Sequence, residues 1–141
     1  MVAKKNIRIR VRAGDTDFTG YWFNAKVIEW FSAGRTELLR SRKITYSEDT
    51  ALIAEGHLQD VSIVLVEVSA RFYAPARFDD LVQLQTKVTE VRDKTIKFEY
   101  AVKRLSDKKI LATGSSISVC IDRKARRSTR IPQRIAELLT T

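Results

Sequence analysis

The sequence predicts an α+β domain in which an antiparallel sheet of about five strands wraps around one long helix. From about Ala25 to Arg42 the apolar side chains recur three and four residues apart, as on one face of a helix. Residues 59–121 contain four successive runs with a period of two, which is typical of strands. Short polar turns between the runs favour an antiparallel meander, against which the helix has to bury its apolar face.

The N-terminal third contains the first strand, a loop and the long helix. Ile7, Ile9 and Val11 alternate with arginines, which predicts a half-exposed strand. Residues 13–24 read as a loop, and Asn24 is a residue type that caps helices. The helix that follows is expected to bury one apolar face, made of Val27, Trp30, Phe31, Gly34 and Leu38.

The remaining elements follow from capping and alternation patterns. Thr45–Glu48 matches the capping box and predicts a short second helix that ends near Glu55, before Gly56. The four alternating runs end near residues 73, 91, 102 and 121, and Gly114 is expected to mark a bulge in the last. Pro132 predicts the start of a small C-terminal helix.

Length and composition exclude several protein classes. A chain of 141 residues with 44% hydrophobic and 30% charged residues is expected to form one domain, residues 1–141, and is not disordered. One cysteine, Cys120, excludes an internal disulfide scaffold and fits a cytoplasmic location. The longest aliphatic runs have four residues, so we expect no membrane span, and we expect no secretory signal.

The net charge of +9 is concentrated at the two ends of the chain. Residues 1–12 have five basic and no acidic side chains, residues 121–141 have six basic and two acidic ones, and the middle is neutral. Such basic patches suit a polyphosphate ligand as well as a nucleic acid, and they also occur as plain solvated faces. Because no basic–aromatic stacking motif is present, nucleic-acid binding is the least favoured of these alternatives.

The segment GDTDFTGYWFN carries the clearest chemical signal. Asp15 and Asp17 lie in one short loop that runs directly into the N-terminus of the predicted long helix. Free amides at a helix N-terminus stabilise an oxyanion, and a nearby carboxylate can attack a carbonyl carbon or activate water. This combination suits acyl transfer. The alternative is structural, with Asp15 as a turn residue and Asp17 as a cap close to the helix.

Three segments resemble the 4-hydroxybenzoyl-CoA thioesterase family, the hotdog-fold acyl-CoA thioesterases. GDTDFTGYWFNAKVIEWF resembles the family signature, and EVSARFYAPARFDDLVQLQTKV resembles its strand–turn–strand segment. LATGSSISVCID, with the later Ile131-Pro132, resembles the last strand and the end of the domain. The similarity extends from about Ile7 to Leu138.

The resemblance implies a hotdog fold, an antiparallel sheet wrapped around the long helix, and dimers that join sheets edge to edge, often paired into tetramers. It also implies that Asp17 is the catalytic carboxylate, either as a nucleophile or as a general base. The backbone amide of Asn24 is then expected to polarise the thioester carbonyl. Two positions depart from the family pattern. Asn24 stands where His or Tyr is frequent, and Tyr21-Trp22 stand where smaller residues are usual, which leaves the specificity for the acyl group open.

We therefore expect an acyl-CoA thioesterase that needs no metal or redox cofactor, since the CoA thioester is the substrate. Gly20, Tyr21, Trp22 and Arg77 are expected to contact the substrate. The phosphates of CoA are expected on a cluster that follows the last strand, Lys124, Arg126 and Arg127. A non-catalytic acyl-CoA-binding protein is the main alternative. The sequence leaves open the acyl chain, CoA or acyl carrier protein as donor, and dimer or tetramer.

Overall fold

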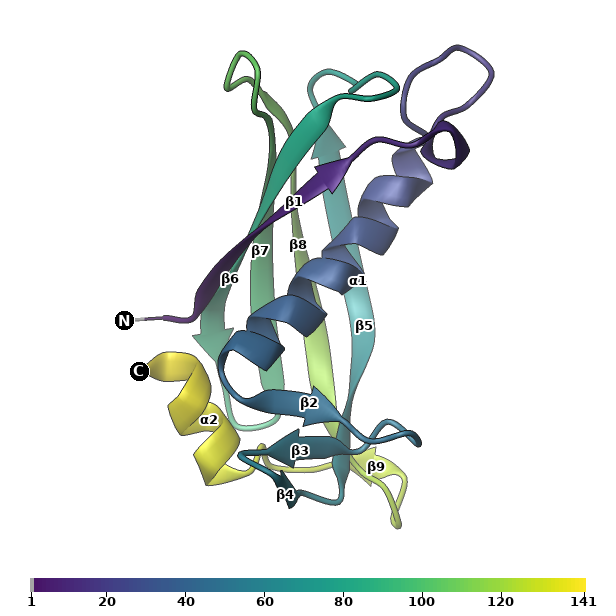
Figure 1. Ribbon diagram of the computed structural model, residues 1–141. Helices are drawn as coiled ribbons and strands as arrows, with labels where there is room; N and C mark the ends of the chain where they lie inside the picture. Colours follow the sequence, from purple (N-terminus) through teal and green to yellow (C-terminus); the bar gives the residue numbers. More distant parts are fainter. Residues whose placement is uncertain (1) are drawn as a thin grey trace.

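The predicted arrangement of sheet and helix is confirmed by the computed structural model, which describes residues 2–141. A curled antiparallel sheet has the strand order β1-β6-β7-β8-β5, and the long helix α1 (Asn24–Ser41) crosses its inner face (Figure 1). The five strands are β1 (Lys4–Arg10), β5 (Val61–Phe72), β6 (Leu81–Val91), β7 (Thr95–Arg104) and β8 (Ile110–Asp122). A short strand, β9 (Arg127–Ser128), pairs with the end of β8.

The core lies between α1 and the inner face of the sheet. Every second residue of the central strands is buried there, as the alternation predicts, and the polar residues between them face outward. The buried set includes Val82, Leu84 and Val88 of β6 and Ile96, Phe98, Tyr100 and Val102 of β7. Each large apolar side chain removed from water in this way stabilises the fold by about 1.5–3 kcal/mol.

Two glycines let α1 approach the sheet closely. A Cβ atom at Gly34 would lie 2.3 Å from the Thr86 hydroxyl, and one at Gly114 would lie 2.5 Å from the ring of Phe31. The bulge predicted at Gly114 is wrong, because Gly114 pairs in regular register with both neighbouring strands. This glycine instead makes room for Phe31, whose ring stacks on Tyr100 with a centroid separation of 4.1 Å.

The predicted second helix is also wrong. A small antiparallel sheet takes its place, made of β2 (Ile44–Tyr46), β3 (Leu52–Ala54) and β4 (His57–Leu58). The Thr45–Glu48 segment, which matches a capping box in the sequence, runs from β2 into the turn before β3, where the Ser47 hydroxyl accepts a hydrogen bond from the amide of Ala51. Ser and Thr side chains satisfy turn amides as well as helix amides, so the pattern is not unique to helices.

The ends of the chain complete the fold. A 3₁₀ turn, Ala13–Asp15, follows β1, and the C-terminal helix α2 (Gln133–Thr140) begins directly after Pro132, as predicted. Ala3 donates a backbone hydrogen bond to Leu139, so the two termini lie side by side. Within residues 2–141, no helix is long and apolar enough to cross a membrane.

Candidate active site

The loop before α1 is held against the turn that connects β5 to β6. Trp22 donates its amide to the carbonyl of Ala76 at 2.9 Å, and Tyr21 forms an isolated β-bridge with Arg77. Val11 and the β5–β6 turn also exchange backbone hydrogen bonds at 2.8 and 2.9 Å. The fold therefore joins two of the sequence segments singled out above, at the upper end of the molecule (Figure 1).

Asp15 has a structural role in this loop. The residue is 1% exposed, and its carboxylate accepts hydrogen bonds from the backbone amide and the guanidinium of Arg12 at 2.9 and 3.3 Å. Burial by itself raises the pKa of Asp15, but the hydrogen bonds and the charge of Arg12 outweigh it and lower the pKa. The Asp15 carbonyl accepts the amide of Phe23, which fixes the chain just before α1.

Asp17 differs from Asp15 because its side chain is exposed. Its carboxylate accepts the backbone amide of Thr19 at 2.7 Å and also the Thr19 hydroxyl. These hydrogen bonds lower the pKa of Asp17, so the group is ionised at neutral pH. Thr19 was not among the predicted site residues, although a Thr two positions after an Asp is a recognisable turn pattern.

The N-terminus of α1 has no side-chain cap. The helix begins at Asn24 rather than after it, with Phe23 in the capping position, so the predicted cap at Asn24 is wrong. Within residues 2–141, the backbone amides of Asn24 and Ala25 have no hydrogen-bond partner. Such amides carry the positive end of the helix dipole and are free to donate to an anionic oxygen.

The aromatic pair after Gly20 is divided between the surface and the core. Tyr21 is half-buried, and its hydroxyl accepts a hydrogen bond from the Arg77 guanidinium at 3.0 Å. The same guanidinium makes a cation–π contact with the Tyr21 ring, with 5.2 Å between the guanidinium carbon and the ring centroid. Trp22 is 2% exposed and packs edge to face against Trp30 and Phe72. Gly20 has a φ of +86°, which favours glycine. The structure thus brings Gly20, Tyr21 and Arg77 together beside Asp17 and turns the Trp22 ring inward.

The three basic residues predicted to bind phosphate lie elsewhere in the chain. Lys124 and Arg126 occupy the exposed turn between β8 and β9, and Arg127 begins β9. This turn is at the opposite end of the sheet from the loop before α1 (Figure 1). One chain therefore does not bring these residues to Asp17.

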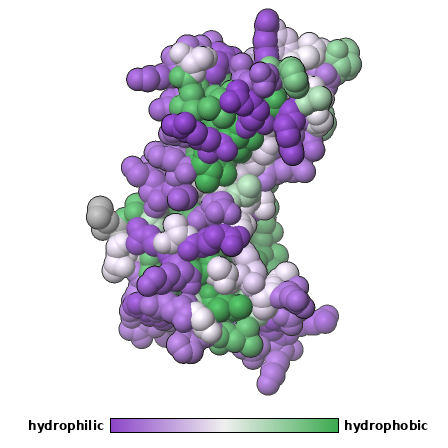
Figure 2. All heavy atoms as spheres, in the orientation of Figure 1, coloured by the Kyte–Doolittle hydropathy of each residue, from purple (hydrophilic) through white to green (hydrophobic). Residues whose placement is uncertain are grey.

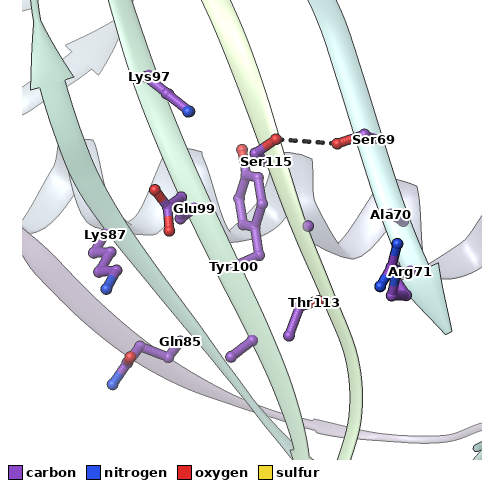
Figure 3. A pocket seen from close by; sticks show the side chains of 12 residues that line it. Ser69, Ala70, Arg71, Gln85, Lys87, Lys97, Glu99, Tyr100, Thr113 and Ser115 are labelled. Carbon is purple, nitrogen blue, oxygen red and sulfur yellow. Dashed lines mark hydrogen bonds between the residues drawn. The ribbon is translucent and has the colours of Figure 1, made fainter. Parts of the chain in front are cut away.

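The surface around the loop is rich in exposed aromatic side chains. Phe18 is 100% exposed, and Phe23 and Phe78 are more than half exposed. Figure 2 shows hydrophobic surface at this upper end of the molecule, mixed with hydrophilic groups. A polar cavity of about 610 Å³ lies on the other, outer face of the sheet (Figure 3), and its lining contains none of the predicted site residues.

Comparison with known proteins agrees with the predicted family. The family model of the Thioesterase-like superfamily matches residues 11–139. The protein named acyl-CoA thioester hydrolase YbgC, from Escherichia coli, is 28% identical over 127 residues, which cover 90% of this chain and 89% of the relative. A Haemophilus influenzae protein named acyl-CoA thioesterase YbgC is 27% identical over 128 residues, with 90% and 88% coverage.

Solved structures agree on the fold. The Thermus thermophilus protein TT1821 superposes with a TM-score of 0.81 at 28% identity, covering 95% of each chain. The Staphylococcus aureus protein SAV2348, solved in complex with CoA, superposes with a TM-score of 0.84 at 13% identity. The match covers 98% of this chain and 82% of the SAV2348 chain. At that identity the second likeness concerns the fold alone. The chain belongs to the Thioesterase-like superfamily and has the hotdog fold that its sequence predicts.

Proposed function

We propose that this protein is an acyl-CoA thioesterase, which hydrolyses an acyl-CoA ester to the free acid and CoA. The observation that carries the proposal is the pairing of an exposed, ionised carboxylate, Asp17, with the uncapped N-terminus of α1 at the end of the same loop. Membership of the superfamily and the likeness to the YbgC proteins support the activity. The geometry of the loop supports the assignment of Asp17.

The reaction requires a polarised carbonyl and a nucleophile. The thioester oxygen would accept a hydrogen bond from the Asn24 amide, which gains strength as negative charge develops on that oxygen. The Asp17 carboxylate then attacks the carbonyl carbon, expels the CoA thiolate and forms an anhydride that water cleaves. In the alternative, Asp17 takes a proton from the water that attacks directly. Neither route requires a metal or a redox cofactor.

The phosphates of CoA are assigned to the basic cluster after β8. Four arginines near the chain ends are paired with carboxylates at 2.5–3.3 Å, namely Arg12, Arg123, Arg130 and Arg134. Lys124, Arg126 and Arg127 have no carboxylate within 4.0 Å in the described part of the chain. Their charges are therefore available to phosphate, and Arg77 is a further candidate beside the loop.

A homo-oligomer is part of the proposal, because β5 is an open edge. Its central residues Val64, Leu65, Val66 and Val68 are 36–59% exposed, and its backbone pairs only with β8 among residues 2–141. A second β5 joined antiparallel would cover this apolar edge and extend the sheet. In such a dimer the basic cluster of one copy approaches the Asp17 loop of the other. We also propose a cytoplasmic location, which the free thiol of Cys120 fits.

The activity is tested by thiol release from a panel of acyl-CoA esters with the purified 141-residue chain. Hydrolysis of at least one ester well above the rate without protein is the expected result. The main alternative, an acyl-CoA-binding protein without activity, predicts that the esters raise the unfolding temperature while no thiol is released. A protein that neither cleaves CoA esters nor is stabilised by them contradicts both. Nucleic-acid binding with a steep salt dependence would then be the remaining candidate.

A further inference from the structure

A second cavity, of about 410 Å³, lies between α1 and β5 and is not used by the proposed chemistry. Ser32, Arg35 and Thr36 of α1 form one wall, while Ile63 and Leu65 of β5 form the other. Of the described residues that line this cavity, only Arg35 is charged. The cavity is therefore positive, with hydroxyl groups and aliphatic side chains around one guanidinium.

Arg35 is a half-buried residue and has no acidic partner within residues 2–141. It donates one hydrogen bond, 3.0 Å, to the hydroxyl of Tyr100, which forms a 2.5 Å hydrogen bond with Ser116. Among residues 2–141, no carboxylate lies within 4.0 Å of this guanidinium, whereas Arg104, which is also partly buried, is paired with Asp80 at 3.3 Å. A partly buried charge is ordinarily paired with an opposite charge. The remaining N–H donors of Arg35 are therefore available to an anionic group of a ligand.

Ser118 adds a hydroxyl group to the same cavity. Its side chain lines the cavity beside Arg35, and the residue is 2% exposed. Tyr46 stands at the rim, where burial raises the pKa of its hydroxyl against the opposing charge of Arg35, so it remains a neutral donor.

We propose that this cavity binds the far end of the acyl group and selects acyl chains that end in a carboxylate, with Arg35 as the residue that recognises it. The guanidinium fork matches a carboxylate, and Ser118 donates a further hydrogen bond. The aliphatic wall of β5 contacts the methylene groups of the chain. This inference rests on the proposed thioesterase function and names its substrate class.

The cavity that serves a given Asp17 belongs to the second copy of the dimer. Within one chain, Arg35 lies about 16 Å along α1 from Asn24, which is too far for a short acyl group. Trp22, just before α1, contacts Phe72 at the end of β5, whereas the cavity touches the first half of β5. Antiparallel joining of two β5 strands brings the first half of one beside the second half of the other. Each cavity then faces the other copy's loop.

The test compares esters of equal chain length with different ends. The pairs are glutaryl-CoA with pentanoyl-CoA, and adipyl-CoA with hexanoyl-CoA, measured by thiol release. For the wild type we expect a higher kcat/KM on the carboxylate-terminated member. In Arg35→Gln, kcat/KM on that member should fall by at least about tenfold, the value of one charged hydrogen bond, and change little on the methyl-terminated member.

Two further variants serve as controls for the loss of charge and for the loss of an arginine elsewhere on α1. Arg35→Lys keeps the charge and should retain part of the preference, and Arg40→Gln removes an exposed arginine of the same helix that pairs with Glu37 and should change nothing. A wild type that prefers the methyl-terminated esters overturns the inference. So does an Arg35→Gln protein, with an unchanged unfolding temperature, that loses activity equally on both members. These results leave the thioesterase proposal intact, whereas cleavage of no ester at all contradicts both.

Discussion

The helix α1 meets the sheet differently along its two sides. Over β6, β7 and the middle of β8 the contact is closed, with Gly34 against Thr86 and Phe31 packed between Gly114 and Tyr100. On the side of β5 the helix presents Ser32, Arg35 and Thr36 to an open cavity. The closed side holds the chain together, and the open side leaves polar groups and a strand edge free for a ligand and a second copy.

The two edge strands show the same difference. β1 has the basic side chains Lys4, Lys5, Arg8 and Arg10 along its length, which discourage pairing with another strand. β5 instead exposes aliphatic side chains over its central residues. Only the β5 edge of this sheet is therefore suited to pairing with a second copy of the chain.

The largest effect on stability is expected on the closed side. Phe31→Ala removes a fully buried ring and leaves a cavity against Tyr100, which should lower the free energy of unfolding by about 3–5 kcal/mol. Thr36→Ala, on the open side of the same helix, should cost less than about 1 kcal/mol. Urea unfolding followed by circular dichroism measures both. Equal losses would contradict the division of α1 into a closed and an open side.

An intermediate effect, on assembly rather than on folding, is expected at the open edge. Val66 is 59% exposed at the centre of β5, where a twofold axis would bring it close to its own copy. Val66→Lys should give monomers in sedimentation experiments, with little change in unfolding and a loss of hydrolysis. Arg8→Ser on β1 is the matched control and should keep the wild-type mass. A Val66→Lys protein that remains oligomeric would show that another surface is used.

A smaller effect on stability is expected from Asp15, and it depends on pH. Because the folded-state pKa is lowered, the carboxylate stabilises the protein above the unfolded value of about 3.9, and this contribution is lost as the pH falls through the folded pKa. Asp15→Asn should therefore lower the free energy of unfolding by about 1–2 kcal/mol at neutral pH. The difference should shrink in acid. A constant difference from neutral pH to pH 3 would argue against the Arg12 pairing.

The sequence predicted the parts of the fold that repeat a simple pattern. The alternation of apolar and polar residues predicted β6 with the bounds that the structure shows, 81–91. The predicted ends of α1 differ from the observed ends by one residue each. Failures occurred where one local pattern serves two structures. Ser47 satisfies a turn amide rather than a helix amide, and Gly114 gives space to a residue from a distant element. Neither outcome is encoded within the local segment.

The candidate site was predictable to the same extent. The resemblance directed attention to Asp17 and Arg77, which lie far apart in the sequence and flank the same loop. It gave no indication of Arg35, because a polar position on a helix is ordinarily solvent-facing and the cavity beside it exists only once β5 and β2 are in place. Which of two nearby carboxylates is buried is likewise not encoded locally, since Asp15 is fixed by hydrogen bonds from the amide and guanidinium of Arg12.

The most direct test of the account compares Asp17→Asn with Asp15→Asn at neutral pH on the best ester of the panel. Asp17→Asn keeps the shape of an exposed side chain, so it should unfold like the wild type while kcat falls at least about 100-fold. Asp15→Asn should lose stability and retain most of its turnover. A folded Asp17→Asn protein with near-wild-type kcat would contradict the assignment of this carboxylate.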